Sequence, residues 1–85
     1  MADESRSVEV RLAFTREIDA LEPLDPATSG QARLEGLELR RQLDRRLLST
    51  EAYSDRLDAL TRRVRDARLL LTATDLGLTP PRADR

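Results

Sequence analysis

The chain has 85 residues, 36% of them charged and 2% aromatic, with a formal net charge of −1. It contains neither cysteine nor histidine, which excludes disulfides, thiolate metal sites and the commonest general base. A chain of this length forms one domain, in which only about 60% of the unfolded chain's surface becomes buried. We therefore expect oligomerisation or a partner protein to reinforce the fold.

The N-terminal residues 1–6 are polar and acidic, and no apolar stretch typical of a signal peptide follows them. We expect them to be disordered. Apolar runs such as Leu69–Leu71 are far shorter than the roughly 20 residues that span a bilayer. The sequence therefore indicates a cytoplasmic protein with no membrane contact.

The spacing of apolar residues predicts a first helix over residues 7–22, with Ser7 as its N-cap. The apolar stripe of this helix consists of Val10, Phe14, Ile18 and Leu21. A β-strand is the rival interpretation, because apolar residues alternate strictly from Val8 to Phe14. A lone strand needs a partner, and no other segment resembles one, so we favour the helix.

A second helix is predicted over residues 27–47, after a proline-containing turn. Asp25 and Pro26 suit its N-cap and first position, and Ser29 is a second candidate cap. One apolar side contains Ala32, Gly36, Leu39, Leu43 and Leu47, and its small members permit close backbone approach. The nearly opposite side contains Leu34, Leu37 and Leu48. A helix that is apolar on two sides is normally packed between two neighbours.

A third helix is predicted over residues 49–73, with Ser49 as its N-cap. Its apolar residues recur at alternating steps of four and three, which is typical of coiled-coil-like packing. This seam consists of Tyr53, Leu57, Leu60, Val64, Ala67 and Leu71. The seam is out of phase with that of the second helix, so a break at Leu48–Ser49 predicts a hairpin. Residues 74–85 are expected to form a flexible tail.

The turn and the start of the third helix resemble the SHOCT-like family of small bacterial helical-hairpin domains over residues 38–62. The family's motif is carried here by Leu47, Leu48, Ser49, Glu51 and Tyr53. The resemblance implies an oligomerisation or protein-interaction hairpin without catalytic activity. Arg46 stands where the family has a turn glycine, which argues against a tight left-handed turn at this position.

The acidic pairs Glu51/Asp55 and Glu35/Glu38 are the only candidates for catalysis or weak cation binding. With no histidine and little volume to enclose a pocket, we interpret them as solvated carboxylates on helix surfaces. No EF-hand spacing or glycine-rich phosphate loop is present. The sequence predicts a protein that is not an enzyme and has no catalytic residue, metal site or cofactor.

A basic cluster near the end of the second helix suggests nucleic-acid binding as an alternative function. It consists of Arg40, Arg41, Arg45 and Arg46. A helix–turn–helix could present these arginines to DNA, as in a small transcription-associated regulator. The acidic net charge, the interleaved Glu38 and Asp44, and acids at the start of the next helix oppose it.

We therefore predict an all-α three-helix unit over residues 7–73, in which a helical hairpin packs with an N-terminal helix. Its expected function is a non-enzymatic adaptor, assembly or regulatory role, through self-association or a larger protein partner. The prediction rests on a surplus of apolar faces over helices able to cover them. The expected partner-binding residues are Leu34, Leu37, Tyr53, Leu57, Leu60, Val64 and Leu71.

Overall fold

The computed structural model describes residues 2–75, which form three helices: α1 (Ala2–Leu21), α2 (Pro26–Asp44) and α3 (Thr50–Asp75). No strand occurs among these residues, so the predicted all-α class is confirmed and the strand interpretation of residues 8–14 is wrong. Thr74 and Asp75, predicted as the start of a flexible tail, belong to α3, and the rest of the predicted tail, from position 76 onward, lies outside the described residues. Within residues 2–75, no helix combines the length and the apolar character needed to cross a bilayer.

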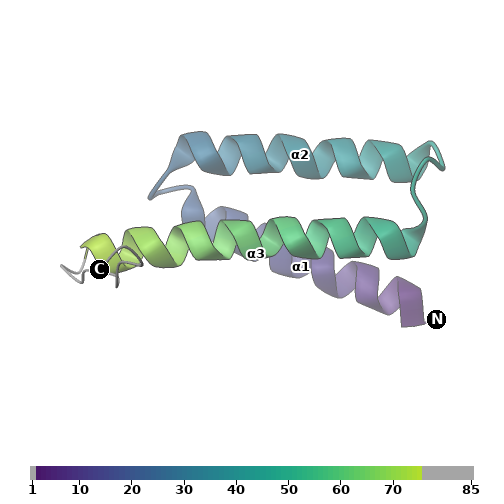
Figure 1. Ribbon diagram of the computed structural model, residues 1–85, viewed down its shortest axis with the longest axis horizontal. Coiled ribbons are helices and arrows are strands. Elements are labelled where there is room, and N and C mark those ends of the chain that lie inside the picture. Colours follow the sequence, from purple (N-terminus) through teal and green to yellow (C-terminus); the bar gives the residue numbers. More distant parts are fainter. Residues whose placement is uncertain (1, 76–85) are drawn as a thin grey trace, which may run out of the picture.

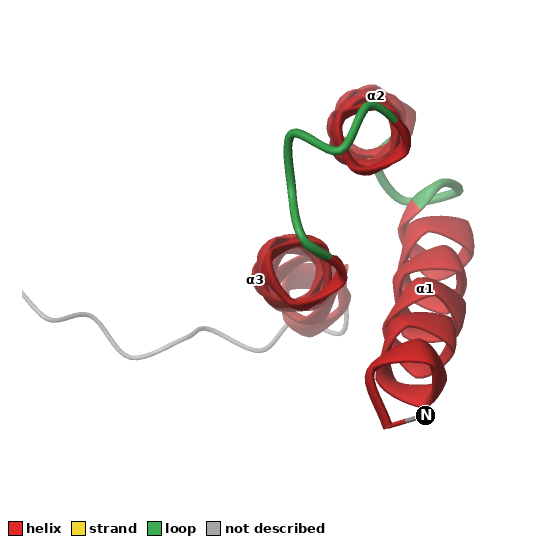
Figure 2. Cartoon of the chain, turned by 90° about the vertical axis from the view of Figure 1, so that its right-hand side faces the viewer, coloured by secondary structure: helices red, strands yellow, loops and turns green. Residues whose placement is uncertain are grey.

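The three helices lie at the corners of a triangle when viewed end-on (Figure 2). α2 and α3 run antiparallel, and α1 crosses obliquely behind α3 in this view (Figure 1). α1 makes most of its tertiary contacts with α3 and far fewer with α2. α2 is therefore the least covered of the three helices.

The core lies along the predicted seam of α3. Its fully buried apolar members are Ile18, Leu21, Ala32, Tyr53, Leu57, Leu60 and Val64. Half-buried side chains from all three helices surround them, namely Val10, Phe14, Leu39, Leu43, Ala67 and Leu71. Full burial of one large apolar side chain contributes about 1.5–3 kcal/mol, so this small cluster is the main source of stability.

α1 begins five residues earlier than the sequence predicted, so the expectation of a disordered segment 1–6 does not hold for residues 2–6. Ser7 is buried inside the helix and does not cap it. The physical reason is a long-range contact: the guanidinium of Arg6 donates to the carboxylate of Asp55 on α3. This ion pair holds the first turns of α1 against the third helix.

The predicted N-caps Asp25 and Ser49 are confirmed, whereas the second candidate Ser29 lies inside α2 and does not cap it. The carboxylate of Asp25 accepts hydrogen bonds from the backbone N of Thr28 at 3.1 Å and from its Oγ1 at 2.6 Å, and Pro26 follows in the first turn. These bonds from Thr28 lower the pKa of the Asp25 carboxyl. The hydroxyl oxygen of Ser49 accepts from the backbone N of Ala52 at 3.0 Å. Each cap satisfies a donor that the first helical turn leaves free.

The turn between α2 and α3 contains a left-handed residue after all. Arg46 has φ of 61°, the N of Arg46 donates to the carbonyl of Leu43 at 3.0 Å, and the N of Leu47 donates to that of Gln42 at 2.8 Å. These two bonds form the Schellman motif that commonly ends helices. α2 therefore ends at Asp44, and Leu47 lies outside the helix and is exposed. The expectation drawn from the missing glycine is wrong.

A close approach between α1 and α2 occurs at Gly36. A Cβ atom placed on this glycine would lie 2.8 Å from both Cε2 and Cζ of Phe14. The small residue that the sequence placed in the α2 seam thus makes room for an aromatic ring from α1. Gly30 lies earlier on α2 in open surroundings, where an added Cβ atom would have no neighbouring atom within 4 Å.

Replacing Arg46 with glycine is expected to stabilise the protein by about 1 kcal/mol, because glycine adopts the left-handed conformation without steric cost from Cβ. The measurement is the free energy of unfolding in urea. Arg45→Gly is the matched control, since Arg45 has φ of −86° and gains nothing from glycine. Equal effects of the two substitutions would contradict the assigned turn.

Gly30→Ala is expected to raise the free energy of unfolding by about 1 kcal/mol, because alanine is the better helix former and the site is open. Gly36→Ala is expected to lower it, since the added methyl displaces the Phe14 ring. In a Phe14→Leu background the Gly36→Ala penalty should shrink. Similar gains from alanine at both glycines would show that the Phe14 ring does not limit this contact.

Candidate protein-interaction surface

The structure divides the predicted partner-binding residues into two groups. Tyr53, Leu57, Leu60 and Val64 are at most 4% exposed, and Leu71 is half-buried against the same cluster. This part of the predicted surface is internal, because α1 and α2 both pack onto the α3 seam. Its side chains are not available to a partner in this fold.

Leu34 and Leu37 form the second group and lie at the surface. Leu34 is 67% exposed and Leu37 is 57% exposed, and the spacing of three residues makes them neighbours on α2. Neither belongs to the apolar cluster that fills the core. Two adjacent leucines are thus presented to solvent by the helix that has the fewest internal contacts.

α2 is flanked by a groove on each side. On the side of α1, two shallow hollows of about 210 and 330 Å³ share Arg11 and Arg40 in their linings. We call this continuous feature the α1/α2 groove. Its floor includes Phe14, Gly36 and Tyr53, and Leu37 lies in its wall.

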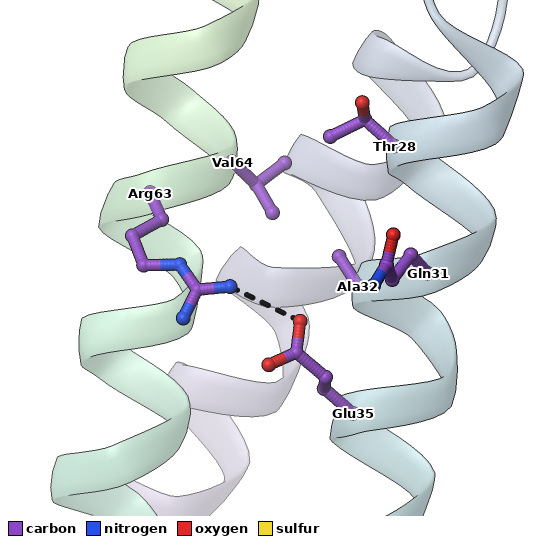
Figure 3. A pocket seen from close by; sticks show the side chains of 6 residues that line it. All are labelled: Thr28, Gln31, Ala32, Glu35, Arg63 and Val64. Carbon is purple, nitrogen blue, oxygen red and sulfur yellow. Dashed lines mark hydrogen bonds and ion pairs between the residues drawn. The ribbon is translucent and has the colours of Figure 1, made fainter.

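The groove between α2 and α3 has a different character. The guanidinium of Arg63 on α3 donates to Glu35 on α2 at 3.0 Å, and these two side chains point toward one another across the gap (Figure 3). Two further hollows adjoin this pair. Both signs of charge are present here, and they pair within the chain.

The predicted arginine cluster is partly engaged with its own helix. Arg40 pairs with Asp44 at 3.1 Å and Arg41 with Glu38 at 3.5 Å. Arg45 and Arg46 are exposed and form no ion pair among the described side chains. Glu38 and Asp44 thus lie within the cluster, and its net positive charge is smaller than four arginines alone would give.

The acidic pairs are dispersed among salt bridges. Glu35 pairs with Arg63, Glu38 with Arg41, and Asp55 with Arg6, while Glu51 is exposed in the first turn of α3. No group of three or more potential metal ligands occurs within the described part of the chain. The acids of these pairs therefore serve helix packing and helix ends in this structure.

Periodicity did not identify two buried polar residues of α3 that share a side of the helix with Arg65 and Arg68, the partners of Glu17 on α1. Ser54 and Thr61 lie seven residues apart on one line of the helix, and each is only 1% exposed. The small size of these side chains allows α1 to approach α3 closely. Their serine and threonine side chains gave no apolar signal, so periodicity alone could not identify them.

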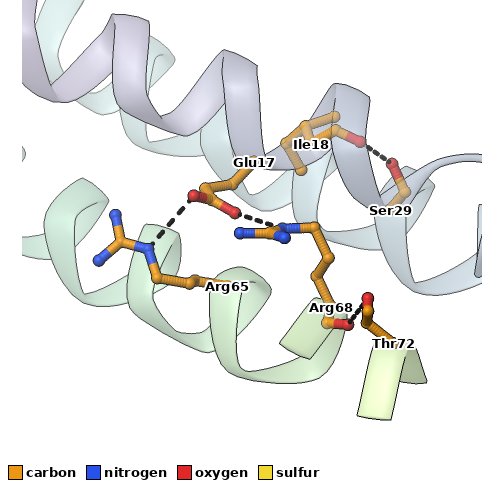
Figure 4. A network of polar contacts seen from close by, with 6 residues as sticks. All are labelled: Glu17, Ile18, Ser29, Arg65, Arg68 and Thr72. Carbon is orange, nitrogen blue, oxygen red and sulfur yellow. Dashed lines mark hydrogen bonds and ion pairs between the residues drawn. The ribbon is translucent and has the colours of Figure 1, made fainter. Parts of the chain in front are cut away.

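Glu17 of α1 forms the main polar contact with α3. Its carboxylate accepts from Nε of Arg68 at 2.8 Å and from Nε of Arg65 at 3.2 Å (Figure 4). The carboxylate is only 14% exposed, and these bonds, Arg68 first, lower the pKa of Glu17 below its ordinary value. Beside it, the hydroxyl of Ser29 donates to the carbonyl of Ile18 and ties α2 to α1.

No family model, curated protein or solved structure matches this chain.

Glu17→Gln is expected to lower the free energy of unfolding by about 1–2 kcal/mol at neutral pH, because two charge-assisted hydrogen bonds are weakened. Because the folded-state pKa of Glu17 lies below the unfolded one, its contribution is complete above pH 4.5 and is lost as the pH falls further. Urea unfolding from pH 7 to pH 3 measures this effect.

Glu22→Gln is the control for Glu17→Gln, since Glu22 forms an exposed pair with Arg33 and should change stability little at any pH. A difference between wild type and Glu17→Gln that stays constant down to pH 3 would show that ionised Glu17 does not carry the contact.

Proposed function

We propose that the protein is a non-enzymatic interaction module that acts as an adaptor, assembly factor or regulator by binding protein through α2. The observation that carries the proposal is the exposure of Leu34 and Leu37 on a helix flanked by grooves on both sides. Exposed apolar patches of this kind mark interaction sites in soluble proteins.

The limited packing of α2 supports the same function. Its core-facing residues are small or half-buried, and only Ser29, Ala32 and Gly36 of this helix are fully buried. A fourth helix placed against α2 would bury the two leucines and complete a bundle, which is the common way for helical proteins to associate. Either a second copy or another protein can supply that helix.

Nucleic-acid binding through the arginine cluster has less support. Two of its four arginines pair with Glu38 and Asp44, and the helix after the turn begins with Glu51 in its first turn. Carboxylates in these positions repel the phosphate backbone. The apolar surface of α2 also has no role in such a complex.

The proposed function is tested with the double substitution Leu34→Ser/Leu37→Ser. Solution mass is measured across concentration, and proteins retained by the immobilised full chain from native extract are identified. We expect at least one association, either self-association or retention of a defined protein, which the double substitution abolishes.

The matched control is Leu69→Ser/Leu70→Ser, which changes two leucines of similar exposure on α3 and should leave the association intact. Unaltered circular dichroism verifies that both variants fold. A chain that stays monomeric and retains no protein, or an association insensitive to Leu34 and Leu37, would contradict the proposal.

A further inference from the structure

Each wall of the α1/α2 groove carries an exposed apolar side chain. Val8 on α1 and Leu37 on α2 line the groove from opposite walls. Phe14 and Leu43 are half-buried apolar residues of the same lining. Tyr53 and Leu57 of α3 lie beneath it and are at most 3% exposed.

The charges around this groove are all positive. Arg11 on α1 and Arg33 and Arg40 on α2 are among its lining residues, and none of the lining residues is acidic. Arg33 and Arg40 also form exposed pairs with Glu22 and Asp44. Exposed pairs of this kind are weak and can exchange for a better-placed carboxylate.

Arg11 has an unsatisfied polar atom. Its Nε is buried and has no hydrogen-bond partner among the described residues. A buried donor without a partner costs free energy, and the cost is larger for a charged group. Arg11 and Arg40 line both hollows from opposite walls, so a carboxylate placed between the hollows would lie beside both side chains, although the enclosed Nε of Arg11 is not itself within its reach.

The dimensions suit a short helix. Ser7 and Thr15 mark the two ends of the α1 wall, and eight residues of helix correspond to about 12 Å. A bound helix of two to three turns would place one apolar anchor in each hollow, seven residues apart. An acidic residue three or four positions after the first anchor would then lie between Arg11 and Arg40.

We infer that the α1/α2 groove binds an amphipathic helix of another protein, in which acidic residues lie between apolar anchors. This inference rests on the proposed function and adds to it the binding site and the chemistry of the partner. Apolar anchors enter the hollows as in other helix-in-groove complexes, and the carboxylate pairs with the arginines. Charge complementarity provides the orientation and the selectivity of binding.

A second copy of this chain fits the groove less well. Symmetric dimers bring the same patch of both copies together. Arg11, Arg33 and Arg40 of one copy would then face the same three arginines of the other, with no carboxylate in either lining. Like charges in a desolvated interface are unfavourable, so the occupant is expected to be acidic and to come from a different protein.

The test uses a displayed library of 15-residue helical peptides selected against the full-length protein. Each peptide carries leucines at two positions seven residues apart, and the residues between and beside them vary among Glu, Lys and Ser. We expect selection to enrich Glu between the leucines. Enriched peptides should lose about tenfold or more in affinity on Arg11→Gln, Arg40→Gln or Leu37→Ser.

Arg62→Gln and Leu70→Ser are the matched controls, because Arg62 pairs with Asp58 on α3 and neither residue lines the groove. Both should bind the peptides as the wild type does. Enrichment of Lys, no enrichment at all, or affinities insensitive to Arg11, Arg40 and Leu37 would overturn the inference. If the protein self-associates through Leu34 and Leu37 but selects no acidic peptide, the proposed function stands and the inference of an acidic helical partner is rejected.

Discussion

The packing of α1 onto α3 is the constraint on which the remaining structure depends. The buried Ser54 and Thr61 let α1 lie close to α3, and Glu17 joins the two helices through Arg65 and Arg68. Because α1 packs along α3 in this way, it does not cover α2 along its length. It contacts α2 closely at Gly36, which leaves space for the ring of Phe14, and at Ser29, whose hydroxyl donates to the carbonyl of Ile18. The α1/α2 groove and the exposed leucines of α2 both follow from that division of contacts.

The features that the sequence predicted well are local or strictly periodic. Asp25 and Ser49 act through hydrogen bonds three residues along the chain, which is why a local pattern could identify them, although the same pattern also suggested Ser7 and Ser29, which do not cap a helix. The seam from Tyr53 to Val64 is likewise visible as a repeat, and its burial follows from that pattern. The exposure of Leu34 and Leu37 agrees with their position opposite the core side of α2.

The features that the sequence could not reveal depend on distant partners or on backbone geometry. The early start of α1 involves Arg6 contacting Asp55, 49 residues away. The left-handed Arg46 has a conformation that its residue type disfavours, and the surrounding Schellman bonds support it. Periodicity also could not decide whether the α3 seam faces its own chain or a partner, because both solutions bury the same residues.

The grooves on the two sides of α2 differ in the charges that line them. Toward α3, Glu35 and Arg63 pair across the gap, and the lining contains both acidic and basic side chains. Toward α1, the charged lining consists only of arginines, and the buried Nε of Arg11 lacks an acceptor among the described residues. Arg33 and Arg40 pair weakly with Glu22 and Asp44 at the surface, and Arg11 forms no ion pair among the described residues. The exposed Val8 and Leu37 beside these arginines favour a helix that carries both a carboxylate and apolar anchors, since a small anion would leave these side chains in water.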